Sequence, residues 1–131
     1  MVTINPLSSR AIEIVVEGEV TRDDVNAAHN RLAELVQDTP ELDVLADFRG
    51  NPSASLSAIA EEVRQLPLVI RVMRSLGRVA IIADEGWVRT VSRMESAAIP
   101  GVRFEVYERR EGALARAWVL RGTDQPRPAL P

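Results

Sequence analysis

Two carboxylates occupy positions where they could do acid–base chemistry. Asp47 and Asp84 lie at the carboxyl ends of two apolar segments, 43–48 and 78–83, which predict central strands. Open α/β sheets bind ligands at that edge, and paired carboxylates can act there as general acid and base. Capping and loop hydrogen bonds explain the same two residues more simply. We expect the simpler role.

Other reactive side chains are scarce. The chain has no cysteine and one histidine, His29, so it lacks the ligands of a usual zinc site and shows no Ser-His-acid spacing. Neither usual Gly-rich phosphate loop is present. We expect His29 on the surface of its helix. The sequence therefore predicts a protein that is not an enzyme, with no catalytic residue, no metal and no cofactor.

Three serines, Ser53, Ser55 and Ser57, stand at the start of an apolar helix. Their hydroxyls can satisfy the free N–H groups of its first turn, which makes them candidate caps. A phosphate at a helix N-terminus is also favourable, so phosphorylation of this cluster is the alternative.

The segment from Leu56 to Gly77 carries the largest apolar surface. One set of apolar residues recurs every three or four positions, and a second set begins after Pro67. The first set is Leu56, Ile59, Val63, Leu66, Ile70 and Met73, and the second is Leu68, Val72 and Leu76. With Val69 they form an apolar arc of roughly 200°. Pro67 cannot donate a helical hydrogen bond, so we expect a break there, with Pro67 opening the second half.

The polar side of the second half of this helix has one sign, because the remaining arc carries Arg64, Arg71 and Arg74 and no acid lies between Val63 and Arg78. Three interpretations remain open for the apolar arc: packing within the domain or on a second subunit, docking at an anionic membrane, and lining a pocket for a lipid or other apolar small molecule. The predicted ligand- or membrane-binding residues are Leu66, Leu68, Val69, Val72, Met73, Leu76, Trp87 and Val91, and the predicted headgroup contacts are Arg71, Arg74 and Arg78. Trp87 belongs either to the core or to a cavity mouth.

Apolar periodicity predicts the remaining elements. Strands are expected at residues 2–5, 11–17, 43–48, 78–83 and 102–107, and helices from a Thr21–Asp24 capping box to 37, then at 56–77, 86–99 and 111–121. Strands joined by helices must run parallel, whereas the first strand is joined by a short turn and should be antiparallel. We predict one α/β domain, residues 1–121, with a five-stranded, mostly parallel sheet in sequential order and about four helices. Residues 122–131 should form a disordered tail.

Composition excludes several classes of protein. The chain has 131 residues and a net charge of -3, which argues against nucleic-acid binding. Arg71 and Arg74 interrupt the longest apolar segment, so no membrane span is expected. The first ten residues lack the basic and apolar regions of a signal peptide. We expect a cytoplasmic protein that can associate peripherally with a membrane.

Three segments carry a family resemblance: Asp47–Gly50, Gly77–Asp84 leading to Trp87, and Phe104 with Glu111 and Ala115–Val119. They resemble the SpoIIAA-like family, of the broader STAS and CRAL-TRIO type of fold, over nearly the whole chain to Arg121. The resemblance implies helices, here 56–76 and 87–99, that shift to open an apolar cavity, and it does not imply catalysis. Anti-sigma-factor antagonists carry a phosphorylatable serine in an Asp-Ser-Ser-Gly setting, at the start of the helix after the middle strand. The serine cluster here lacks the preceding acid and the following Gly, which argues against a phospho-switch.

We therefore predict a non-enzymatic STAS-like module that binds an apolar ligand, a lipid or an anionic membrane surface through the helix broken at Pro67. The alternative is a regulatory protein-interaction module of the anti-sigma-factor-antagonist type. A homodimer is compatible with both, because one sheet face and the apolar arc could each be covered by a second copy.

Overall fold

The computed structural model describes residues 1–53, 56, 58–59, 62, 66–89, 92 and 101–124. Its elements in chain order are β1 (Val2–Ser8), β2 (Ala11–Val16), α1 (Arg22–Asp38), β3 (Leu42–Phe48), α3 (Pro67–Arg74), β4 (Leu76–Ala83), the 3-10 turn η1 (Glu85–Trp87), β5 (Arg103–Glu108), the 3-10 turn η2 (Arg109–Glu111) and α5 (Gly112–Asp124).

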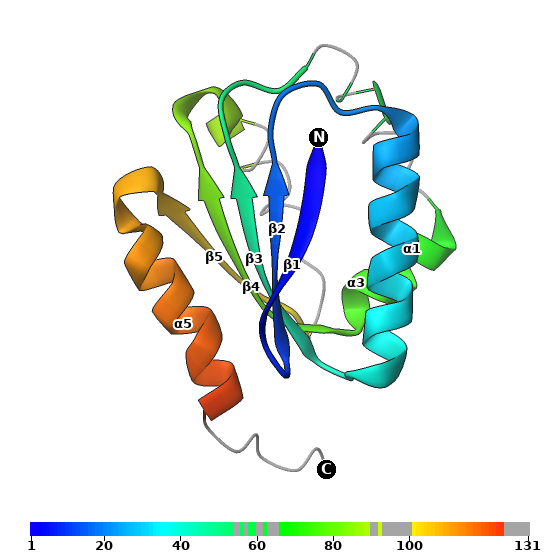
Figure 1. The fold of residues 1–131 in the computed structure, drawn as a ribbon, viewed down its shortest axis with the longest axis vertical. Helices are drawn as coiled ribbons and strands as arrows, with labels where there is room; N and C mark the ends of the chain where they lie inside the picture. Colours follow the sequence, from blue (N-terminus) through cyan, green and yellow to red (C-terminus); the bar gives the residue numbers. More distant parts are fainter. Residues whose placement is uncertain are drawn as a thin grey trace.

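The five strands form one sheet in the order β1-β2-β3-β4-β5 (Figure 1). β1 pairs antiparallel with β2, and all other neighbours pair parallel. β3 and β4 have nearly all of their residues buried, as their continuous apolar sequence predicts. The predicted fold class is confirmed.

Helices cover both faces of the sheet (Figure 1). On one face, Val25 and Leu32 of α1 and Met73 of α3 pack against the larger apolar cluster. On the other face, Ala115 and Val119 of α5 are fully buried in a second cluster. A sheet covered on both faces needs strands that are apolar on both sides, and β3 and β4 meet that need.

The first elements follow the sequence with one correction. α1 begins at the predicted capping box, where the Asp24 N–H donates to Thr21 Oγ1 at 3.1 Å and the Thr21 N–H donates to Asp24 Oδ2 at 2.9 Å. β1 runs on to Ser8 and so includes Pro6, which was expected in a turn. An edge strand tolerates proline because one side of its backbone has no strand to bond.

The helix predicted at 56–77 differs from the prediction at its end. Pro67 is the first residue of α3, and Leu66 before it has an extended backbone (φ -77°, ψ 127°), so the break at Pro67 is confirmed. α3 ends at Arg74, however, and Leu76 begins β4, where it pairs with Leu42. The prediction that Leu76 lies on the helix is wrong. Leu76 is the first residue of the central strand β4, and its side chain is buried in the sheet core.

Two further helices can be compared with their predicted ranges only over the residues that the structure describes. The helix predicted at 86–99 begins with η1, and residues 88, 89 and 92 are helical, while 90–91 and 93–100 lie outside the described residues. The described part of the chain therefore bounds three α-helices, against about four predicted. α5 continues to Asp124, three residues past its predicted end, and 125–131 lie outside the described residues.

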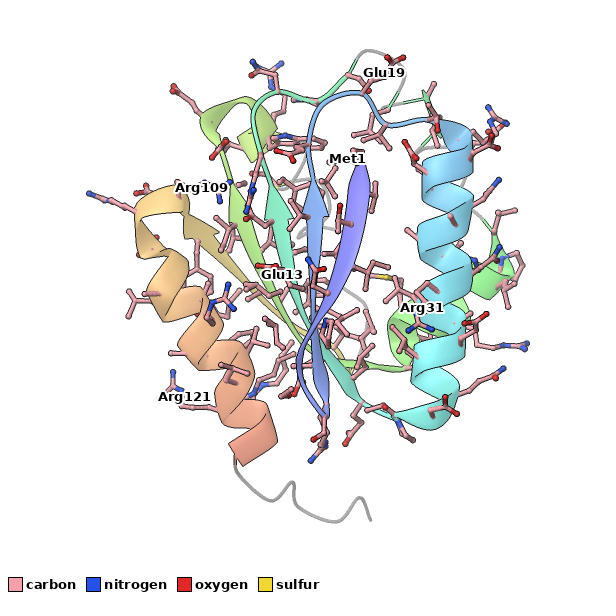
Figure 2. The ribbon with its side chains drawn as sticks, viewed as in Figure 1. Met1, Glu13, Glu19, Arg31, Arg109 and Arg121 are labelled. Atoms are coloured by element: carbon pink, nitrogen blue, oxygen red, sulfur yellow. The ribbon has the colours of Figure 1, made fainter. Side chains whose placement is uncertain are left out.

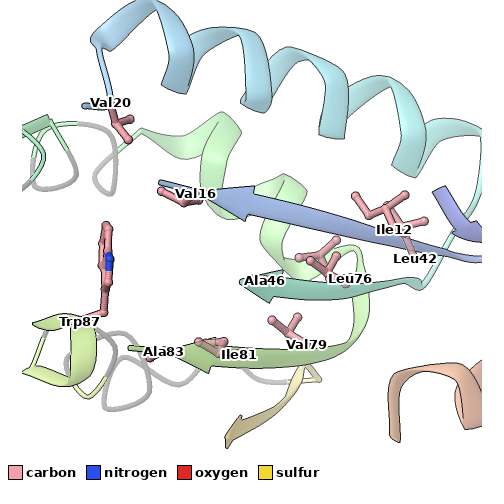
Figure 3. Packing of buried hydrophobic residues seen from close by; sticks show 11 residues of the cluster. Ile12, Val16, Val20, Leu42, Ala46, Leu76, Val79, Ile81, Ala83 and Trp87 are labelled. Carbon is pink, nitrogen blue, oxygen red and sulfur yellow. The ribbon is translucent and has the colours of Figure 1, made fainter. Parts of the chain in front are cut away.

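The larger apolar cluster lies between the sheet and the α1–α3 layer (Figure 3). Leu76 belongs to it, and Leu76 and Val72 are each only 5% exposed. Leu68, one turn before Val72 on α3, is 54% exposed. The apolar arc of the sequence therefore divides into side chains that hold the core and side chains that face solvent.

This division predicts different effects for the same substitution. Leu76→Ala should lower the free energy of unfolding by about 2–5 kcal/mol, because it leaves a cavity in the core. Leu68→Ala removes the same atoms from a half-exposed position and should change it by less than about 1 kcal/mol. Denaturant unfolding measures both. Equal losses would contradict the placement of Leu68 at the surface.

Candidate functional site

The carboxyl edge of the sheet brings together charged residues from three strands. Asp47 lies near the end of β3, Asp84 follows β4, and Arg109 follows β5. The parallel register aligns these strand ends, since Phe48 pairs with Ala83 and Ala83 with Glu108. Figure 2 shows Arg109 close to the tips of β3 and β4.

From the end of β5, Arg109 bonds to the ends of both β3 and β4. Its Nη1 lies 2.6 Å from Asp47 Oδ1, and its Nε donates to Asp84 Oδ1 at 2.7 Å. Its Nη2 donates to the carbonyl of Phe48 at 3.3 Å. A planar guanidinium presents several donors in a fixed geometry, which lets one side chain join partners on separate strands.

Arg49 completes this arrangement, which we call the strand-end network: Asp47, Arg49, Asp84 and Arg109. Asp47 is 4% exposed, and its Oδ2 accepts from Arg49 Nε at 3.0 Å. A carboxylate removed from water needs nearby positive charge and hydrogen-bond donors, and the two arginines supply both. The two acids and two bases cancel, so the network is neutral overall.

Asp84 also fixes the loop that follows β3. The Gly50 N–H donates to Asp84 Oδ2 at 2.6 Å, and Gly50 has a φ of 69°, a conformation that glycine adopts without strain. This backbone hydrogen bond, with the contact to Arg109, lowers the pKa of Asp84 from its ordinary value of 3.8. Asp84 is also the N-cap residue of η1, but its side chain makes no capping hydrogen bond there.

Both carboxylates that the sequence marks for possible chemistry are thus held by donors of the same chain. This geometry supports the interpretation of loop hydrogen bonds over that of an acid–base pair. Sequence reasoning missed Arg109. Its position two residues after the last predicted strand, next to the ends of the two strands that carry the acids, is the signal that the sequence offers, but the pairing itself depends on contacts distant in sequence.

Trp87 makes a second set of contacts at this edge of the sheet. It is 1% exposed, its ring lies 4.9 Å from that of Phe48, and its Nε1 donates to the carbonyl of Arg49 at 3.0 Å. Figure 3 shows it at one end of the apolar cluster. Trp87 therefore holds the core and the loop after β3 together, which agrees with its predicted core role.

The predicted binding residues of the broken helix do not all share one surface. Leu66 and Leu68 are 51% and 54% exposed, and Ile70 is 37% exposed. The structure places Val69 and Met73 as half-buried, Val72, Leu76 and Trp87 as buried, and Val91 lies outside the described residues. A binding surface built from α3 must therefore use the exposed residues and not Val72 or Leu76.

The rotation of α3 decides which residues face outward. Successive helical residues turn by about 100°, so the exposed residues run around the helix from Ile70, nearly opposite the buried Val72, through Arg74 and Arg71 to Leu68, which lies one turn before Val72. We call this the exposed face of α3: Leu66, Pro67, Leu68, Ile70, Arg71 and Arg74, all classed as exposed. The two arginines lie with Pro67 at its centre, between Leu66 and Ile70 on one side and Leu68 on the other.

Arg78, the third predicted headgroup contact, belongs elsewhere. It lies on β4, its Nη1 donates to the carbonyl of Trp118 at 2.9 Å, and its guanidinium stands 5.3 Å from the centre of the Trp118 ring. Its N–H donates to Oδ1 of the buried Asp43 at 2.8 Å. Trp118 packs with the α5 layer, on the opposite face of the sheet from α3. Arg78 therefore cannot act together with Arg71 and Arg74.

The serine cluster and the histidine are only partly placed. Ser53 is half-buried, and its carbonyl accepts from the Leu56 N–H at 3.1 Å, while Ser55 and Ser57 lie outside the described residues. His29 is half-buried on α1 rather than fully exposed. Among the described residues, no group of acids and histidines is arranged to hold a metal ion.

A hollow of about 500 Å³ opens beside the strand-end network, and its lining is Met1, Glu17, Gly18, Glu19, Arg49 and Gly50. None of the residues predicted to bind an apolar ligand lines it.

The lowered pKa of Asp84 predicts a pH-dependent contribution to stability. An acid whose pKa is lowered by folding stabilises the fold above its unfolded pKa and loses that contribution as pH falls through the folded value. Asp84→Asn should therefore be less stable than the parent at pH 7, and the difference should shrink as pH falls below the ordinary value of 3.8. Thermal unfolding of both proteins from pH 7 to the acid limit tests this. A difference that stays constant would show that the charge of Asp84 does not stabilise the fold.

The contact between η1 and the loop after β3 predicts a steric effect. A Cβ at Gly86 would lie 1.9 Å from Asn51 Oδ1, so Gly86→Ala should destabilise the protein by about 1–3 kcal/mol. Adding Asn51→Ala should recover part of this loss. Gly112→Ala is the matched control, because its Cβ would meet Ile82 Cδ1 at an ordinary 3.8 Å at the start of α5. If Gly86→Ala is as mild as Gly112→Ala in denaturant unfolding, the packing of this edge is looser than described.

Comparison with protein-family models gives a match over most of the domain. The sequence model of the SpoIIAA-like family matches residues 11–120, a range that includes the strand-end network and the exposed face of α3. No curated protein and no solved structure matches the chain. Within the described part of the chain, no helix combines the length and apolar character that crossing a membrane requires. The match covers most of the 131 residues, and the chain belongs to the SpoIIAA-like family.

Proposed function

We propose that this chain is a non-enzymatic, STAS-type regulatory module that binds a protein partner through the exposed face of α3. The observation that carries the proposal is the outward placement of Leu66, Leu68 and Ile70 on one short helix of a SpoIIAA-like domain. Exposed apolar side chains that cluster on one element are typical of interaction sites. The proposed role is the regulatory alternative that the sequence left open.

The exposed face is held in a fixed position, which favours specific binding. Val72 anchors α3 in the core on its inner side, and Pro67 fixes the backbone of its first turn. A partner therefore does not have to order this helix before binding it. Preorganisation of this kind raises affinity, because less conformational entropy is lost on association.

The strand-end network supports the non-enzymatic part of the proposal. Its two carboxylates are paired with Arg49 and Arg109, and one of them is nearly inaccessible to solvent. A general base needs a lone pair directed at a substrate proton. Here the carboxylate oxygens already form hydrogen bonds and ion pairs with groups of the protein. We therefore assign the network the role of holding the loop after β3.

A second candidate is binding of an apolar ligand or an anionic membrane by the same face. The observation that favours it is the combination of three exposed apolar side chains with Arg71 and Arg74 and no acid from Leu66 to Ser75. Binding driven in this way would depend on anionic lipid and would weaken in high salt.

The test uses two surface variants chosen to leave the fold intact. Leu66 is the N-cap of α3 and makes no side-chain capping bond, so Leu66→Ser should if anything stabilise the helix. Leu68→Glu places an acid in the first turn, where the helix dipole favours it. Leu114→Glu is the matched control, because Leu114 is 61% exposed near the start of α5 on the opposite layer.

We expect affinity capture with the parent protein to retain a partner that the Leu66→Ser, Leu68→Glu variant loses and the Leu114→Glu variant keeps. The purified partner should then bind the parent with saturation and fixed stoichiometry in calorimetry. Loss of at least about tenfold in affinity is expected if these leucines are among the few interface residues that each cost more than about 1 kcal/mol when removed. Equal binding by all three proteins would refute the proposed surface. Co-sedimentation with phosphatidylglycerol vesicles, lost only in the double variant, would favour the second candidate.

A further inference from the structure

Two arginines lie at the centre of the exposed face of α3, and no residue that the structure describes supplies a counter-charge to them. Arg71 and Arg74 are exposed, and neither forms an ion pair with any residue that the structure describes. The other exposed arginines include several that are paired within the chain, such as Arg22 with Glu62 and Arg31 with Glu34. The net charge of the chain is -3, so this positive patch is local.

The position of these arginines argues against membrane docking. In a helix that lies in a membrane surface, the apolar side chains form the centre of the inserted face and cations extend from its borders to the headgroups. α3 has the opposite arrangement, with Arg71 and Arg74 between Leu68 on one border and Ile70 on the other. Inserting both borders would carry the arginines into the apolar layer, which is unfavourable.

The same charges argue against a second copy of the chain as the occupant. A two-fold dimer places the same patch of both subunits against each other. Two exposed faces of α3 would then oppose four unpaired arginines, with no acid between Leu66 and Ser75 to compensate. Like charges brought together across an interface disfavour association.

We infer that the partner of this face is a protein segment that is acidic at its centre and apolar at its borders. This inference rests on the proposed function and names the chemistry of the partner. Arg71 and Arg74 are three residues apart, which places their Cβ atoms roughly 5–6 Å from each other on one side of the helix. Two carboxylates spaced three or four residues apart on a partner helix match that separation. Apolar residues beside them would cover Leu68 and Ile70.

The experiment titrates the full chain with two synthetic helical peptides and follows backbone amide shifts by NMR. Both peptides carry the same leucines, and they differ only in having glutamates or lysines at the central positions. The acidic peptide should shift the amides of 66–75 and the basic peptide should not. Arg71→Gln, Arg74→Gln should weaken the acidic peptide about tenfold and remove its salt dependence, because exposed interface charges act through screened attraction. Arg103→Gln, Arg121→Gln is the control, since it removes the same charge from exposed positions away from α3.

Equal shifts with both peptides, or an unchanged affinity in the Arg71→Gln, Arg74→Gln variant, would overturn the inference. If a captured partner still depends on Leu66 and Leu68 in that case, the proposed function stands and only the charge assignment fails. If capture itself does not depend on Leu66 and Leu68, the proposed function fails first. Tight binding to phosphatidylglycerol vesicles that requires both arginines would also overturn the inference, in favour of a lipid surface.

Discussion

Burial of β3 and β4 on both faces is the constraint from which the rest of the molecule follows. Strands that are apolar on both sides need a helical layer above and below, and the chain supplies α1 and α3 on one face and α5 on the other. Parallel pairing then brings the carboxyl ends of β3, β4 and β5 to one edge. Polar groups at that edge lie close to the core, and they must be neutralised within the protein.

The strand-end network is the response to that requirement. Asp47 is almost removed from solvent, and Arg109 reaches it from the end of β5 while also bonding to Asp84. The same contacts determine where the loop after β3 and η1 lie, through Gly50 and the Trp87 indole. A position at which related sheets can bind ligands is here used to connect strand ends. The binding face that we propose therefore lies on a helix and not at the sheet edge.

The sequence predicts the fold well, because strand order and pairing follow from apolar periodicity and from the lengths of the connections. It also predicts the break at Pro67, which is a local effect of one residue type. It could not predict the rotation of α3, because that depends on which side chains of the helix pack against elements distant in sequence, as Met73 does in the larger apolar cluster. It could not identify Arg109, whose bonds to Asp84 and the Phe48 carbonyl span 25 and 61 residues. Leu76 was misplaced for a related reason: a leucine at the end of an apolar helix pattern fits a following strand equally well.

The order of side chains around α3 has a consequence for specificity. Apolar borders alone would bind many surfaces of suitable shape, since the hydrophobic effect has no direction. The arginines between them pair with no described residue, so they weaken the binding of a partner that leaves their charge uncompensated and strengthen that of one that places carboxylates opposite. Specificity is a difference between affinities, and repulsive elements contribute to it as much as attractive ones. On this argument the apolar residues Leu66, Leu68 and Ile70 would provide the affinity for a partner. Arg71 and Arg74 would provide the specificity, because they favour partners with carboxylates opposite them.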